Sequence, residues 1–421
     1  MHNRRLFYAT FLISGVLMVG GCTSGPSEPE RGVLPRNLTP EEVHLLQASD
    51  YFGLKLFREV VAQQPESNIF ISPLSVSMAL GMTANGAADS TLNAMRATLE
   101  LDDLTEEESN QAYQSLIELL TSADKEVRFD IANSIWYRLI WSFNEDFLQR
   151  CRTYFGAEVQ GLDFSDPGAA DIINAWVKEK TNGKIEEIVQ PPINPLTAMF
   201  LINALYFKGT WTYEFDPDDT EDDEFTLLNG TKVTCEMMNQ ETDLLYAAAD
   251  QFQMVDLPYG NELFSMTVLL PKEGIHIDTL VAELMSENWA TWIGALDTHA
   301  VRLSLPRFKL AYKLKMNDVL ASLGMGIAFD DGQADFQRML VEGAAYPGNL
   351  FIDKVLHKTF VQVDEEGTEA AAVTMVEMGF TSIGPSSLTM RVDRPFIFVI
   401  RERTSGALLF MGKIVEPVWE E

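Results

Sequence analysis

The pattern of apolar and polar positions divides the chain into a helix-rich first half and a strand-rich second half. In the first half, apolar residues recur at the spacing typical of amphipathic helices over residues 41–63, 74–84, 90–99, 106–122 and 169–181. Short apolar runs typical of strands follow over residues 197–207, 252–257, 264–270, 301–305, 360–363, 395–401 and 408–415. Helices followed by strands predict an α+β fold with antiparallel sheets, because a doubly wound fold would alternate the two.

One later segment has a strand pattern without the composition of an ordinary strand. From residue 368 to residue 381 it would form a strand of about 45 Å, at roughly 3.3 Å per residue. Its two glutamates, Glu369 and Glu377, fall on one face. The other face carries Thr368, Ala370, Ala372, Thr374, Val376 and Met378. Consecutive alanines have low β-propensity, so nothing local commits this segment to a sheet, and its small side chains suit late insertion between strands already in place.

The length and composition predict a large folded domain with an acidic surface. The chain has 421 residues, of which 46% are hydrophobic and 10% aromatic, which is ample for a sizeable core. It carries 31 Lys and Arg against 62 Asp and Glu, a formal net charge of −31. Such a surface repels phosphate backbones, so we expect no nucleic acid partner. No internal repeat or Pro/Gly-rich break divides the chain after residue 40.

The first residues have the features of an export signal. A basic start is followed by an apolar run over residues 6–19, which is short for a membrane span of about 20 residues. The junction at residues 19–22 resembles the lipobox of bacterial lipoproteins, which implies a signal peptide at residues 1–21 and acylation of Cys22. An ordinary secretory signal is the alternative. Residues 22–40 have the composition of a flexible tether, and we expect the folded domain over residues 41–421, in contact with a membrane only through Cys22.

The sequence offers little for catalysis or metal binding. Without Cys22, only Cys151 and Cys235 remain, too few for a disulfide scaffold, although one bridge stays open. Cys151 lies at helical spacing within residues 145–155 and fits a buried thiol. The chain has five histidines and contains no Gly-x-Ser-x-Gly or His-Glu-x-x-His motif. We therefore expect no enzyme, no catalytic residue, no metal and no cofactor, although an unrecognised carboxylate hydrolase remains the less favoured alternative.

Several ordered segments resemble one family. Residues 365–372, Glu-Glu-Gly-Thr-Glu-Ala-Ala-Ala, are similar to the hinge of the reactive-centre loop of the serpins, suicide inhibitors of proteases. Residues 68–75, 201–211, 301–310 and 393–401 are similar to further landmarks of that family, in the expected order. The resemblance covers residues 41–421. It implies helices packed around a large mixed, mainly antiparallel sheet plus two smaller sheets, with an exposed reactive-centre loop at about residues 365–392.

The resemblance also assigns roles to residues. The hinge would comprise Glu365, Glu366, Gly367, Thr368, Glu369, Ala370, Ala371, Ala372, Val373 and Thr374. A hydrogen-bonded group beneath the main sheet, which we call the shutter, would comprise Ser72, Ser75, Asn203 and His357. The point where the loop first enters the sheet, which we call the breach, would comprise Trp211, Arg307 and Glu365, the last two forming an ion pair. Without the resemblance, His357 would read as a core or edge histidine that needs a partner.

Two counts place the reactive bond differently. The usual family spacing from Glu365 gives cleavage between Thr381 and Ser382, whereas counting back from Arg394 gives a site near Gly384. We prefer the first, because insertion depends on the length from hinge to cut and Pro385 disfavours cleavage at Gly384.

The residues near the cut indicate which proteases would be inhibited. Thr381 suits elastase-like pockets, and a shift to Phe380 suits chymotrypsin-like or subtilisin-like enzymes. The expected function is suicide inhibition of serine endopeptidases by a monomer, through a covalent acyl-enzyme complex. The alternatives are inhibition of a papain-like cysteine protease and a non-inhibitory binding protein on the same fold.

Overall fold

The computed structural model describes residues 32–368 and 387–419. The α-helices are α1 (Pro40–Gln63), α2 (Pro73–Ala84), α3 (Asp89–Thr98), α4 (Glu106–Thr121), α5 (Glu145–Phe155), α6 (Ala169–Lys180), α7 (Ile277–Glu283), α8 (Ser286–Gly294) and α9 (Asn317–Leu320). The strands are β1 (Ile69–Ile71), β2 (Val127–Arg138), β3 (Glu158–Leu162), β4 (Met199–Thr210), β5 (Glu221–Thr226), β6 (Lys232–Ala248), β7 (Phe252–Tyr259), β8 (Phe264–Pro271), β9 (Asp297–Pro306), β10 (Phe308–Lys315), β11 (Leu356–Val363), β12 (Gly367–Thr368), β13 (Leu388–Arg391), β14 (Phe396–Glu402) and β15 (Leu408–Ile414). The elements predicted from periodicity are present, and the α+β class is confirmed. Most differ from the prediction by a few residues at their ends, but β9 and β11 begin four residues before the predicted strands over residues 301–305 and 360–363.

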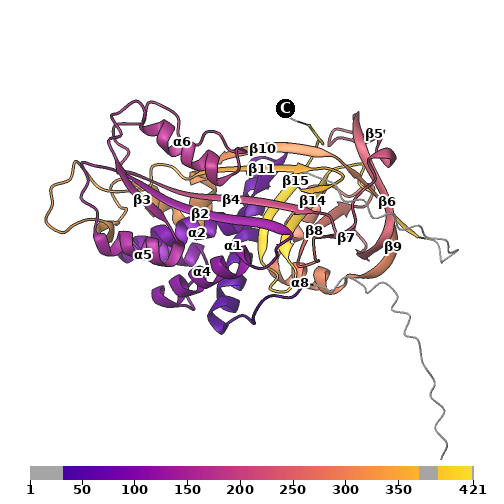
Figure 1. The fold of residues 1–421 in the computed structure, drawn as a ribbon, viewed down its shortest axis with the longest axis horizontal. Coiled ribbons are helices and arrows are strands. Elements are labelled where there is room, and N and C mark those ends of the chain that lie inside the picture. The colour runs from indigo at the N-terminus through magenta and orange to yellow at the C-terminus, as the bar shows by residue number, and fades with distance from the viewer. Residues whose placement is uncertain (1–31, 369–386, 420–421) are drawn as a thin grey trace, which may run out of the picture. The chain divides into compact units, whose positions relative to one another are not determined.

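A six-stranded sheet forms the long layer of the domain (Figure 1). Its strand order is β10-β11-β12-β4-β2-β3, and every neighbouring pair is antiparallel except the parallel pair β2–β3. This is the large mixed, mainly antiparallel sheet that the family resemblance implied. Within the described residues, the two-residue strand β12 is the element that joins β11 to β4.

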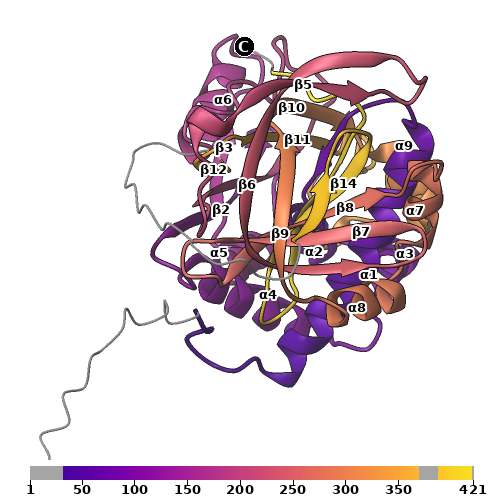
Figure 2. The ribbon, with the colours of Figure 1, turned by 90° about the vertical axis from the view of Figure 1, so that its right-hand side faces the viewer.

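The remaining strands belong to a second sheet in which two smaller sheets are linked. Its order is β1-β15-β14-β8-β7-β6-β9-β13, with β5 also paired to β6. Figure 2 shows β5, β6, β7, β8, β9 and β14 of this sheet. Most of β6 pairs with β9, whereas its last four residues, 245–248, pair with β7. The two smaller sheets that we expected are therefore continuous through the end of β6.

Helices cover both faces of the six-stranded sheet. On one side, α2 packs against both β4 and β15, and eleven of its twelve residues are buried. A helix enclosed in this way has no polar face, and its first turn is capped by the side chain of Ser72, followed by Pro73. On the other side, α6 packs over β2 and β4 through a separate apolar cluster that includes Trp136 and Trp176 (Figure 1).

The end of the expected tether contacts the domain. Arg36 forms an ion pair with the buried side chain of Glu42 in α1 and donates a hydrogen bond to Ser115 Oγ at 2.7 Å. The backbone N–H of Gly32 donates to the carbonyl oxygen of Asn261. Residues 32–39, which we assigned to the tether, are therefore attached to the folded domain by these polar contacts.

The end of the expected reactive-centre loop differs from the prediction. Residues 388–391 form β13, which pairs in parallel with β9 over residues 301–304. These residues are held by backbone hydrogen bonds, so the loop is shorter at its C-terminal side than the range 365–392. No strand pattern is visible at these positions, because a four-residue edge strand with two exposed polar residues lacks an apolar run.

Candidate functional site

The described part of the hinge begins a strand between β11 and β4. Thr368 pairs with Val363 of β11, and Gly367 and Thr368 pair with Thr210 and Gly209 of β4. In the described residues no pairing joins β4 to β11 directly, so the two strands are linked only through these two hinge residues. The arrangement presents two strand edges that a longer segment could join.

Gly367 is the residue that allows this close approach. A Cβ atom at this position would lie 2.2 Å from the carbonyl oxygen of Gly209, which is backbone and cannot give way. Its φ of 157° also lies at the edge of the region that favours glycine. A larger residue would therefore push the hinge out from between the two strands.

Thr368 is held by a buried hydrogen bond that the sequence did not reveal. Its Oγ1 lies 2.5 Å from the hydroxyl oxygen of Tyr259, and Thr368 is 3% exposed. The ring of Tyr259 stacks on Trp211, with centroids 4.5 Å apart and planes inclined by 12°. Burial raises the pKa of Tyr259, so its hydroxyl stays protonated. Tyr259 ends an apolar strand, where the pattern predicts an ordinary core residue. Nothing in the sequence pattern distinguished it from other core residues.

The turn before β12 is fastened by the breach residues. Trp211 donates from Nε1 to the carbonyl oxygen of Asp364 and from its backbone N–H to that of Glu366, both at 2.9 Å. Thr220 donates from Oγ1 to Glu365 Oε1 at 2.7 Å. The expected ion pair is present, with Arg307 Nε 3.4 Å from Glu365 Oε2. The side chain of Glu365 is only 10% exposed, so this pair is partly shielded from solvent.

Arg307 also connects the breach to the C-terminal tail. Its guanidinium carbon lies 4.4 Å from the ring centroid of Trp419, and its Nη1 lies 3.2 Å from Glu236 Oε2. The tail is aligned along β10, because the backbone N–H of Lys309 donates to the carbonyl oxygen of Val418 at 2.8 Å. Sequence reasoning missed Trp419, which lies in a short polar tail with no periodicity. A cation over an indole face is an attractive arrangement that holds the arginine in place.

The structure brings the four shutter residues into one hydrogen-bonded chain beneath the six-stranded sheet. The backbone N–H of Ser72 donates to His357 Nε2 at 3.0 Å, and Ser75 N–H donates to Ser72 Oγ at 3.3 Å. Ser75 Oγ donates to Asn203 Oδ1, whose amide nitrogen donates to Asn133 Oδ1 at 2.6 Å. The chain thus links α2, β11, β4 and β2.

Two features of this network follow from its burial. Burial lowers the pKa of His357 to about 4, so the imidazole is neutral and Nε2 can accept the hydrogen bond from Ser72. Asn133, which sequence reasoning missed, is 2% exposed and pairs directly opposite Asn203 in the β2–β4 register. An asparagine inside an apolar strand is the signal that could have identified it, because a buried amide requires partners.

Other predicted site residues lie outside the described residues. These are Glu369, Ala370, Ala371, Ala372, Val373, Thr374, Phe380, Thr381, Ser382 and Cys22. Glu366 is described and accepts through its carbonyl oxygen from Trp211, as given above. In the two described ranges, no group of three or more His, Cys, Asp or Glu side chains could hold a metal ion, and no helix is long and apolar enough to cross a membrane.

Cys151 and Cys235 are both buried free thiols, so the open question of a bridge between them is answered. Burial raises the pKa of Cys151 and raises that of Cys235 to about 11, and neither thiol is activated.

Comparison with known proteins identifies the family. A family model described as "Serpin (serine protease inhibitor)" matches residues 47–417. Iripin-2 of Ixodes ricinus is 35% identical over 380 residues, covering 89% of this chain and 94% of that protein. The human leukocyte elastase inhibitor is 34% identical over 384 residues, covering 89% and 99%. The native structure of the thermophilic serpin tengpin superposes with a TM-score of 0.80 at 34% identity, covering 91% of this chain and 96% of that one. The chain belongs to the serpin family.

Proposed function

We propose that the protein is a suicide inhibitor of serine endopeptidases. A protease cleaves the reactive-centre loop, and the loop then inserts into the six-stranded sheet while still bound to the enzyme as an acyl ester. The observation that carries the proposal is β12, because Gly367 and Thr368 already lie between β11 and β4. Insertion continues a pairing that has started, and the energy released comes from completing the sheet.

The composition of the hinge supports continued insertion. Side chains alternate along a strand, so residues two and four positions after the buried Thr368 would face the same side. Those residues are Ala370 and Ala372, and Thr374 follows. Small uncharged side chains can be buried there without desolvating a charge, whereas a charged or bulky residue would oppose insertion.

The target class follows from the residues at the cut. We infer cleavage between Thr381 and Ser382, or after Phe380, by elastase-like, chymotrypsin-like or subtilisin-like enzymes. Similarity to a leukocyte elastase inhibitor is in keeping with the first of these. In each case the enzyme's nucleophile attacks the carbonyl carbon of the residue before the cut, and the new amino terminus leaves as the acyl-enzyme forms. A papain-like cysteine protease is the alternative target.

The test is incubation of the chain from residue 22, with Cys22→Ser, against elastase, chymotrypsin, subtilisin and papain. Denaturing gels and mass spectrometry would follow the products. The proposal expects a covalent complex with a serine protease and release of a peptide that begins at Ser382. Complex formation with papain alone would mean that the target is a papain-like cysteine protease and not a serine endopeptidase. Cleavage without any complex would indicate a non-inhibitory binding protein on the same fold.

We further propose that the protein is exported and attached to the cell envelope through acylated Cys22. The short apolar run and the lipobox-like junction at residues 19–22 support this. Expression with a labelled fatty acid, compared with Cys22→Ala, tests it. Label in the parent chain and none in the variant is expected, and an unlabelled parent chain would contradict the anchor.

A further inference from the structure

A pocket of about 500 Å³ lies at the end of the six-stranded sheet away from β12. Its walls are the first half of β4, the start of β11 and the segments over residues 188–198 and 349–355, and α2 forms its floor. Pockets that bind small molecules have volumes of about 300–1,000 Å³. This pocket is therefore large enough for a molecule of that size. It is separate from the hinge and the breach, but the shutter residues Ser75, Asn203 and His357 line part of it.

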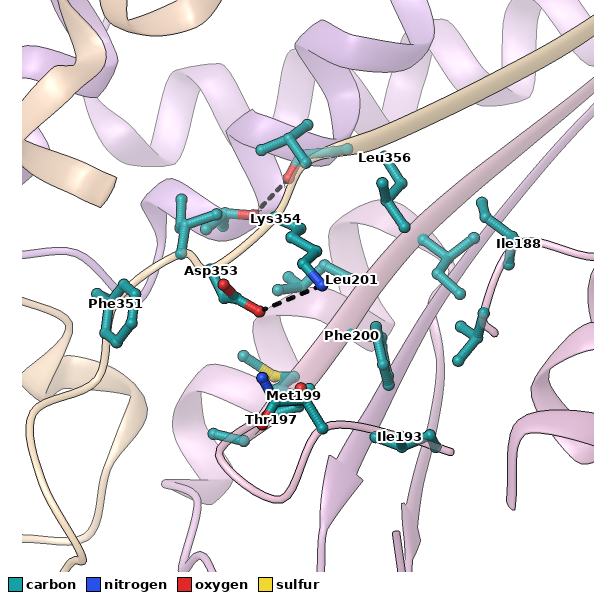
Figure 3. A pocket seen from close by; sticks show the side chains of 18 of the residues that line it. Ile188, Ile193, Thr197, Met199, Phe200, Leu201, Phe351, Asp353, Lys354 and Leu356 are labelled. Atoms are coloured by element: carbon teal, nitrogen blue, oxygen red, sulfur yellow. Dashed lines mark hydrogen bonds and ion pairs between the residues drawn. The ribbon is translucent and has the colours of Figure 1, made fainter. Parts of the chain in front are cut away.

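The lining contains both apolar and polar groups, and the apolar surface is somewhat larger. Figure 3 shows Phe200 and Leu201 of β4, Ile188 and Ile193 of the segment after α6, and Leu356 of β11 around the pocket. Phe200, Leu201 and Leu356 are partly exposed, so their apolar surface is in contact with solvent. Burial of such surface by a ligand would be favourable, because it removes apolar area from water. The body of a suitable ligand is therefore an apolar chain or ring.

The charged side chains of the lining are two lysines and one aspartate. Among the described residues they are Lys313, Lys354 and Asp353, in a chain whose net charge is −31. Figure 3 shows Lys354 and Asp353 directed into the pocket, where Lys354 Nζ lies 4.0 Å from Asp353 Oδ2. That ion pair is long, and its side chains are 51% and 46% exposed. Such a pair contributes little and can be replaced by a better acceptor.

Lys313 has no compensating charge. Its ammonium group forms no hydrogen bond or ion pair in the described residues, and the residue directly opposite it on β11 is Lys358. Like charges opposite each other in a sheet repel. Lys358 is itself satisfied by the carbonyl oxygen of Glu187, 2.9 Å from its Nζ. An anionic group at the edge of the pocket would be attracted to Lys313 without displacing any partner.

We propose that this pocket binds an amphipathic anion, with its apolar part against Phe200, Leu201 and Leu356 and its carboxylate near Lys313 and Lys354. A single-chain fatty acid of medium length has this chemistry. The pocket lies between the ends of β4 and β11, along which the cleaved loop would insert under the proposed function. Binding to the uncleaved chain can be measured without a protease, so a failure of this inference is distinguishable from a failure of the proposed function.

The test uses three probes of equal chain length and different charge. Isothermal titration of the chain from residue 22, with Cys22→Ser, would compare decanoate, decanol and decyltrimethylammonium. The site expects saturable binding of one decanoate per chain, weaker binding of decanol and no binding of the cation. Absence of saturable decanoate binding, or binding of the cation as tight as that of decanoate, would overturn the proposal.

Charge variants locate the site. Lys313→Gln combined with Lys354→Gln should weaken the binding of decanoate by about five- to tenfold, since two exposed ion pairs are each worth a few-fold in affinity. The binding of decanol should be unchanged. Lys315→Gln is the matched control, because Lys315 is an exposed lysine of the same strand that does not line the pocket. An equal loss of affinity in the control, or no loss in the double variant, would place the anion elsewhere.

Discussion

The hydroxyl groups of Thr368 and Tyr259 are hydrogen-bonded at 2.5 Å in a site where both residues are nearly inaccessible to solvent. Thr368 is also paired on both sides, to Val363 and to Gly209. The first threonine of the hinge is thus positioned by backbone pairing and by a tyrosine whose ring stacks on Trp211. Under the proposed mechanism, any change that excludes this side chain from the sheet would act at the first step of insertion.

Thr368→Arg should convert the inhibitor into a substrate. An arginine at this buried position would place an unpaired charge beside Tyr259, at a cost of several kcal/mol. Insertion would slow while deacylation would not, so the cleaved fraction should rise by about tenfold or more relative to complex. Thr368→Ser, which keeps a small side chain and the hydroxyl, is the control. The ratio of complex to cleaved chain on denaturing gels is the measurement, and a stable complex formed by the arginine variant at the parent ratio would refute this.

Glu365→Lys should favour premature opening of the sheet. The change removes the carboxylate that accepts the hydrogen bond from Thr220, and it replaces the ion pair with Arg307 by a repulsion. Because the site is poorly exposed, the loss should lower the free energy of unfolding by about 1–3 kcal/mol. We expect a lower melting temperature and faster polymerisation on mild heating, followed by size-exclusion chromatography. Glu236→Lys is the matched control, since Glu236 also contacts Arg307 but is half exposed and outside the hinge. A Glu365→Lys chain that stays monomeric and fully inhibitory would contradict the role of the breach.

The pH dependence of stability should contain a contribution from His357. Its pKa is lowered to about 4 in the folded protein, against an ordinary value of 6.5. The unfolded chain therefore binds a proton at higher pH than the folded chain does. The free energy of unfolding should decrease as the pH falls from about 6.5 to about 4, by up to about 3 kcal/mol, and this contribution is complete below that range.

Denaturant titrations of the parent chain and His357→Gln across that pH range measure this contribution. The variant should have the flatter profile, because glutamine does not titrate. His44→Gln, at an exposed histidine of α1, is the control and should follow the parent chain. Parallel profiles for the parent and His357→Gln would show that the imidazole is not the group responsible.

The fold was predictable where apolar periodicity is undisturbed. The helices α1 to α6 and the strands β7, β8, β14 and β15 have such patterns, and their positions were correct, whereas the short helices α7, α8 and α9 were not predicted. Strand β2 was missed because Asp130, Asn133 and Ser134 interrupt its apolar pattern, although Asn133 and Ser134 are buried and hydrogen-bonded. Long-range pairing satisfies these polar groups, and a local pattern contains no information about it.

The site was predictable only in part, and for a related reason. The shutter and breach residues were identified through family resemblance, since nothing local distinguishes Ser72 or Asn203 from other polar residues. Tyr259 and Trp419 were missed because their roles depend on contacts with residues more than one hundred positions away along the chain. The two-residue strand β12 is too short to have a periodicity, and only the sheet around it defines it.

Trp419→Ala should accelerate the loss of the native state. The indole lies over the guanidinium of Arg307, which in turn holds Glu365, so the tail supports the breach through one shared arginine. A partly exposed cation–π contact is worth about 0.5–2 kcal/mol. We therefore expect inhibitory activity to be lost a few-fold faster on incubation at elevated temperature. The initial rate of inhibition should change little. Trp419→Phe keeps an aromatic face and should restore most of the stability. If Trp419→Ala decays at the parent rate, or if Trp419→Phe decays as fast as alanine, then the tail does not stabilise the breach through this contact.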